Sequence, residues 1–135
     1  MKTICLSLFV SLIFLVSCEK TDPDSIIGNW NSIEITDNIY IAKRVKRLDE
    51  PEYGFSFKEG SVFLERKIDG WCGTPPVVYA DYTGTWSKTD SLVVINVGYW
   101  GGRMIYRWTI ISVDETQLLY TIDSIRTLPD YSLLQ

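Results

Sequence analysis

The sequence predicts an all-β domain whose antiparallel strands follow one another as an up-and-down meander. From residue 26 onward, aromatic and β-branched residues dominate, and these residues favour strands. Turn-forming residues interrupt the chain at short intervals, so the later connections are too short to hold a crossover helix. Consecutive strands therefore lie side by side and run in opposite directions.

The strands can be placed in chain order from these two signals. The seven predicted strands span residues 26–36, 53–58, 61–68, 77–87, 92–100, 103–113 and 117–123. The pair Gly101-Gly102 suits a two-residue hairpin, because glycine adopts positive φ at little cost.

Residues 37–51 are the segment that reads least like a strand. Ile41, Val45 and Leu48 fall at helical spacing, which predicts a short amphipathic helix or a lid-like loop. The segment also carries a basic cluster, which forms either an anion or headgroup site or a solvated face balanced by neighbouring acids. The cluster consists of Lys43, Arg44, Lys46 and Arg47. Residues 92–100 are apolar on both faces, so this strand is either buried on both faces or covered on its outer face by residues 37–51, and we expect the cover.

Alternation along three of the strands predicts which side chains face the interior. The large inward aromatic residues are Tyr82, Trp86, Tyr106, Trp108 and Tyr120. They either fill the core or line a pocket for an apolar or planar ligand, with tyrosine hydroxyls orienting it.

The first predicted strand opens with Ile27-Gly28-Asn29-Trp30, which resembles the Gly-x-Trp signature of lipocalins. Residues 55–62, 84–94 and 108–119 are similar to the compact lipocalin-like domains of bacterial lipoproteins. The resemblance implies a small closed barrel of about eight strands that binds a small hydrophobic or amphipathic ligand. It also implies that Trp30 plugs one end of the barrel under an arginine, which by position is Arg126.

The N-terminus predicts a secretory signal. Lys2 precedes an apolar run over residues 4–16, which is shorter than the roughly 20 residues that a membrane span needs. Leu15-Val16-Ser17-Cys18 resembles a bacterial lipobox, which implies cleavage before Cys18 and acylation of its thiol. The expected divisions are a signal peptide (1–17), a lipidated terminus and tether (18–25) and a barrel (26–135), held in the cell envelope, most simply at the outer membrane.

Composition excludes several functions. The chain has 17 acidic and 13 basic residues, a net charge of −4, and no basic stripe, so no nucleic-acid partner is expected. Histidine is absent, and Cys72 is the one cysteine left once Cys5 leaves with the signal and Cys18 carries lipid. We therefore expect no internal disulfide, no His/Cys metal site, no cofactor and no catalytic triad.

The turn-rich loop at residues 69–76 holds the remaining candidates. Trp71 could contact a partner or a sugar, and Cys72 could pair between chains, although Gly and Pro there are first of all turn residues. Nothing in the sequence brings Asp69 and Asp81 together as a catalytic carboxylate pair, so no enzymatic activity is expected. The expected function is ligand binding at a membrane surface. The alternative is a solid barrel that docks on an envelope protein or glycan.

Overall fold

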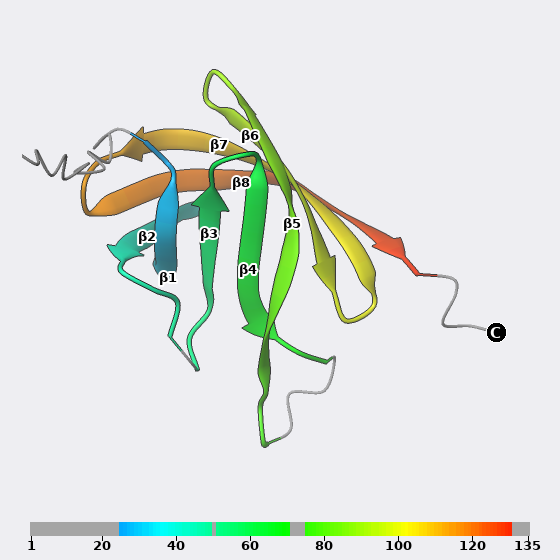
Figure 1. The fold of residues 1–135 in the computed structure, drawn as a ribbon. Helices are drawn as coiled ribbons and strands as arrows, with labels where there is room; N and C mark the ends of the chain where they lie inside the picture. The colour runs from blue at the N-terminus through cyan, green and yellow to red at the C-terminus, as the bar shows by residue number, and fades with distance from the viewer. Residues whose placement is uncertain (1–24, 50, 71–74, 131–135) are drawn as a thin grey trace, which may run out of the picture.

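A computed structural model describes residues 25–49, 51–70 and 75–130 of the chain. These residues form a closed barrel of eight antiparallel strands (Figure 1). The predicted all-β antiparallel barrel is thereby confirmed. Among the described residues, no helix is long and apolar enough to cross a bilayer.

The barrel follows a simple up-and-down order except at its first hairpin. The strands are β1 (Gly28–Thr36), β2 (Ile39–Val45), β3 (Gly54–Lys58), β4 (Val62–Ile68), β5 (Tyr79–Thr89), β6 (Leu92–Tyr99), β7 (Gly102–Val113) and β8 (Gln117–Pro129). From β3 to β8, each strand pairs with the next. By contrast, β1 lies between β2 and β3, and β2 pairs with β8 to close the barrel.

The segment 37–51 contains β2 and forms neither a helix nor a lid. Asp37 and Asn38 have φ angles of 51° and 64°, as a tight hairpin turn requires, and they lead directly from β1 into β2. The helical interpretation was wrong because Ile41 and Val45 are an even number of residues apart, which also places them on one face of a strand.

The expected cover over residues 92–100 was also wrong. Strand β2 lies between β1 and β8, whereas β6 pairs with β5 and β7. Strand β6 instead alternates, with Val93, Ile95 and Val97 fully buried inside the barrel. The turn that follows it is Trp100–Gly101, one residue earlier than predicted, because Tyr99 pairs with Gly102.

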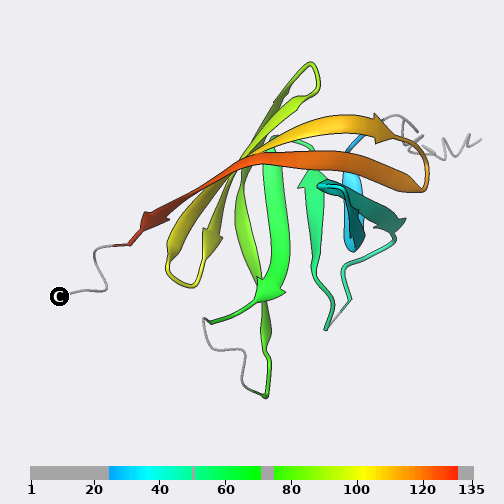
Figure 2. The same cartoon turned by 180° about the vertical axis from the view of Figure 1, so that it is seen from behind.

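The two ends of the barrel differ. The start of β1 and the turns after β3, β5 and β7 lie at what we call the closed end. The turns after β1, β4 and β6, and the end of β8, lie at the open end, whereas β2 ends at the closed end and β3 begins at the open end. Figures 1 and 2 show the β4–β5 hairpin and the extension of β7 and β8 diverging toward the open end. Pairing stops accordingly, since β5 pairs with β6 only from Gly84 onward and β8 pairs with β2 only as far as Thr121.

Candidate functional site

An aromatic cluster fills the half of the barrel toward the closed end. The ring of Phe55 packs edge-on against Trp108 at 5.0 Å and against Tyr120 at 5.8 Å, and Trp108 stacks on Tyr120 at 4.4 Å. Phe57 and Phe63 complete the cluster, and all five side chains are fully buried. Trp108 and Tyr120 are therefore core residues, which is the first of the two alternatives that the sequence left open.

A buried charged network lies next to this cluster, on its side toward the open end. Glu65 is only 1% exposed, and its carboxylate accepts hydrogen bonds from the hydroxyls of Tyr53 at 2.8 Å and Tyr106 at 3.3 Å. Lys67 Nζ lies 2.6 Å from the other carboxylate oxygen of Glu65. Alternation along β4 positions these groups, because Phe63, Glu65 and Lys67 all point inward.

The tyrosines of the network are held in their neutral form. Burial raises the pKa of Tyr106 well above its ordinary value, and the Glu65 carboxylate raises it further. The same two causes, in the same order, raise the pKa of Tyr53. Both phenols therefore remain proton donors to Glu65 throughout the physiological pH range.

Lys67 forms the boundary between the buried network and the open end. Its side chain is 14% exposed, and its ammonium lies 3.6 Å from Met104 Sδ and 5.2 Å from the centre of the Tyr82 ring. The Tyr82 hydroxyl donates to Asp69, at the end of β4. A lysine ammonium has three donors, and the contacts to Glu65 and Met104 account for two of them. The third can meet an acceptor that enters from the open end.

Exposed apolar side chains lie on the same inner face as this network. Ile125 is directly opposite Tyr106 in the β7–β8 ladder, and Ile35 is directly opposite Tyr40 in the β1–β2 ladder. Direct antiparallel partners place their side chains on one face of the sheet. Ile125 is 55% exposed and Ile35 is 62% exposed. The inner face toward the open end thus combines buried charged and hydroxyl groups with exposed apolar side chains, a combination suited to an amphipathic small molecule.

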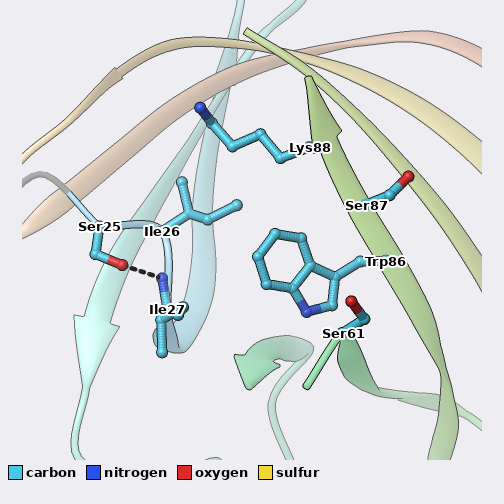
Figure 3. A pocket seen from close by; sticks show the side chains of 7 residues that line it. All are labelled: Ser25, Ile26, Ile27, Ser61, Trp86, Ser87 and Lys88. Carbon is cyan, nitrogen blue, oxygen red and sulfur yellow. Dashed lines mark hydrogen bonds between the residues drawn. The ribbon is translucent and has the colours of Figure 1, made fainter. Parts of the chain in front are cut away.

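The five predicted lining residues are divided between different places. Tyr106 belongs to the charged network, and Tyr82 is partly buried beside Lys67. Trp86 lies near the closed end, where its Nε1–H donates to the Lys58 carbonyl at 3.0 Å. It lines a separate pocket of about 480 Å³ between the N-terminal segment and the end of β5 (Figure 3).

The Gly-x-Trp segment has a clear structural role, but its arginine partner was wrongly assigned. The guanidinium of Arg44 lies 4.1 Å from the centre of the Trp30 ring. Arg126 is exposed near the end of β8, opposite Ile105, because β8 continues along β7 toward the open end. Gly28 has a φ of 145°, and a Cβ there would lie 2.6 Å from Arg44 Nη1, so the glycine leaves room for the guanidinium.

Arg44 also fixes the N-terminal segment to the barrel. It donates to the carbonyls of Ile27 at 2.8 Å and Ser25 at 2.9 Å, while Trp30 Nε1 donates to the Ile26 carbonyl at 2.8 Å. Burial lowers the pKa of Arg44, and the Asp114 carboxylate opposes that shift. The position was predictable in principle, because Arg44 is the cross-strand partner of Trp30 once β2 is recognised as a strand.

The basic cluster at residues 43–47 does not form one site. Alternation sends Arg44 inward and leaves Lys43 exposed outside, while Arg47 forms an ion pair with Asp49 at 2.8 Å. The solvated face is therefore the better description.

The carboxylates of Asp69 and Asp81 are engaged separately. Asp81 forms a bidentate pair with Arg66 on the outer face, whereas Asp69 accepts from Tyr82. No group of three or more metal-ligating side chains occurs in the part of the chain that the structure describes. Cys18, Trp71 and Cys72 lie outside the described residues.

Comparisons with protein-family models, curated proteins and solved structures find no match to this chain. The assignment of function therefore depends on the geometry of the barrel and on the N-terminal sequence.

Proposed function

We propose that this chain is a lipid-anchored, lipocalin-like protein of the bacterial cell envelope that binds a small amphipathic molecule at the open end of its barrel. The lipobox-like sequence that ends at Cys18 supports the anchor, and the closed antiparallel barrel supports the lipocalin-like assignment. In this proposal the lipid holds the protein at the outer membrane, and the barrel binds without catalysing a reaction.

The observation that carries the proposal is the ion pair between Glu65 and Lys67 inside the barrel. A buried ion pair is weak support for stability, because the cost of removing both charges from water can exceed their attraction. Apolar side chains at these two positions would close the barrel interior at least as well. An inward-facing ion pair whose lysine is still 14% exposed is therefore better explained by ligand recognition.

The geometry limits the size and chemistry of the ligand. The aromatic cluster fills the half of the barrel toward the closed end, so the ligand does not reach that end. A hydrogen-bond acceptor on the ligand would meet the Lys67 ammonium, because the hydroxyls of Tyr106 and Tyr82 already donate to Glu65 and Asp69. The apolar part of the ligand would lie against Met104 and Ile125, near the exit of the barrel.

A second candidate is a solid interaction module that docks on an envelope protein or glycan. The aromatic cluster that fills the barrel toward the closed end favours this candidate. The exposed β6–β7 turn also favours it, because Trp100 is 49% exposed there and packs edge-on against Tyr99 at 5.7 Å. Exposed aromatic side chains of this kind are common in partner contacts.

Titration of the full-length chain in lipid nanodiscs with a panel of anionic and neutral amphipathic fluorophores tests the binding proposal. Saturable binding that Lys67→Met abolishes and Lys43→Met preserves is the expected result, since Lys43 is exposed on the outer face of β2. Absence of saturable binding, together with recovery of an envelope partner by crosslinking through the β6–β7 turn, would favour the docking module instead.

The anchor is tested separately by intact mass and membrane fractionation. The wild-type chain should lose residues 1–17, gain acyl mass and sediment with membranes. A Cys18→Ser variant should do none of these. A Cys72→Ser variant serves as the control, and loss of membrane association in both variants would contradict acylation at Cys18.

A further inference from the structure

The pocket beside Trp86 lies where the chain enters the barrel. Its lining residues are Ser25, Ile26, Ile27, Ser61, Trp86, Ser87 and Lys88, and its volume is about 480 Å³. Figure 3 shows the Trp86 ring facing Ile26 and Ile27, with the Lys88 side chain reaching over Ile26. The Ser61 hydroxyl lies beside the indole, whereas the Ser87 hydroxyl points away from the other side chains.

The lining provides chemistry suited to a phosphate group attached to an apolar chain. Lys88 is exposed and is the one charged residue among those lining the pocket. A lysine ammonium is a point donor that commonly binds phosphate, and a serine hydroxyl adds a further donor. Trp86 has one polar edge, turned to the Lys58 carbonyl, and an apolar body, which is the character of tryptophans at membrane interfaces.

The chain before Ser25 places this pocket close to the bilayer. Arg44 holds the carbonyls of Ser25 and Ile27, so the chain leaves the barrel at the rim of the pocket. The seven steps from Cys18 to Ser25 span at most about 25 Å when fully extended. A lipid on Cys18 would therefore keep the rim of the pocket within about 25 Å of the anchor point in the membrane.

We propose that this pocket binds the phosphate of a membrane phospholipid, so that the closed end of the barrel rests on the membrane and the open end faces the aqueous side. The inference depends on the proposed lipid anchor at Cys18. It adds an orientation to that anchor, since a tether alone leaves the barrel free to rotate.

Hydrogen–deuterium exchange of the full-length chain tests the proposal. The acylated chain, verified by its intact mass, is compared in vesicles of phosphatidylcholine with phosphatidylglycerol and in micelles of a maltoside detergent that lacks phosphate. Exchange should slow in vesicles at residues 58–61 and 86–88 and remain unchanged at residues 98–102. Equal exchange in vesicles and micelles at residues 58–61 and at residues 86–88 would overturn the pocket assignment while leaving the lipid anchor in place.

Charge variants separate the pocket from general attraction to the membrane. Reversal of one lysine near an anionic surface should reduce binding by at least about fivefold, so Lys88→Glu should abolish the protection at residues 86–88. Lys46→Glu is the matched control, because Lys46 is exposed just beyond the closed end of β2 and does not line the pocket. Equal loss of protection in both variants would refute a specific site.

A further arm distinguishes a lipid headgroup from free phosphate. Inorganic phosphate is added to the micelle sample at the concentration of lipid phosphate used in the vesicles. Protection should be absent, because the headgroup is held close by the anchor and free phosphate is not. If free phosphate produces the same protection, the pocket is a site for a soluble phosphate and the proposed orientation is wrong. If the intact mass shows no acyl group, the anchor itself fails.

Discussion

Neutralising the ion pair inside the barrel should separate stability from ligand binding. Three variants are compared with the wild type: Glu65→Gln, Lys67→Met and the double variant. Removing Lys67 leaves a carboxylate that is 1% exposed without its cation, although the hydroxyls of Tyr53 and Tyr106 still donate to it. Because breaking a buried pair costs about 3–5 kcal/mol, we expect Lys67→Met to cost about 3 kcal/mol.

The other single variant should be milder. In Glu65→Gln the side-chain amide oxygen still accepts from the two tyrosines, and the Lys67 side chain, which is 14% exposed, can reach water at the open end. We expect a cost of about 1–2 kcal/mol for this variant. In the double variant no charge is left uncompensated, so its stability should return to within about 1 kcal/mol of the wild type.

Urea unfolding followed by tryptophan emission at pH 7 measures all four proteins. Thermal unfolding provides a second reading, with an expected decrease in Tm of about 12 °C for Lys67→Met in a domain of this size. The double variant should fold and yet fail to bind any fluorophore that the wild type binds. If its loss of stability equals the sum of the single losses, the two charges stabilise the barrel independently, and their retention for binding is refuted.

Three further predictions concern the rest of the barrel. Arg44→Met should cost about 2 kcal/mol in urea unfolding, since it removes charged hydrogen bonds and a ring contact. Arg126→Met should change stability by less than about 0.5 kcal/mol. Equal effects would contradict the assignment of Arg44 as the arginine that packs on Trp30. Gly84→Ala should cost about 2 kcal/mol, because a Cβ at Gly84 would overlap the β6 backbone, and unchanged thermal unfolding would show that the strands can separate there. Burial first, and then the hydrogen bond to Asp69, raise the pKa of Tyr82 to about 12. In the unfolded chain this hydroxyl loses its proton near pH 10, at a lower pH than in the folded protein. The contribution of Tyr82 to stability should therefore be constant below about pH 10 and fall between pH 10 and 12. In a Tyr82→Phe variant this contribution is absent, and an unchanged loss of stability between pH 10 and 12 in that variant would argue against the shift.

The inner face of the barrel could be predicted from alternation alone. Tyr106, Trp108 and Tyr120 were assigned inward from the pattern of their strands, and all three pack in the interior. Alternation shows a direction and gives no depth, so it could not distinguish a core residue from one that lines an opening. That distinction depends on where along the barrel neighbouring strands stop pairing, and only the three-dimensional structure determines this.

The charged network shows a different limit. Glu65 and Lys67 share the inner face of β4 with Phe63, yet two charged residues in an exposed-looking strand ordinarily indicate a solvated face. Their inward direction follows from the register of β4 with its neighbours. The contact of Arg44 with Trp30 was not predicted for a related reason. The tight turn at Asp37 and Asn38 was not recognised, so β2 was not predicted as a strand.

The extension of β8 beyond β2 has a consequence for self-association. Within the described residues, β2 pairs with β8 only as far as Thr121, so the stretch from 122 to 129 has β7 on one side and an open edge on the other. An open edge is a template on which a second chain can add a strand. Arg126 places a charge in this stretch, and Pro129, which lacks an N–H donor, ends it. Both are features that natural sheets use against edge-to-edge aggregation. Arg126 thus protects the open edge of β8 against strand addition by a second chain. Replacing Arg126 with an apolar residue should therefore increase aggregation.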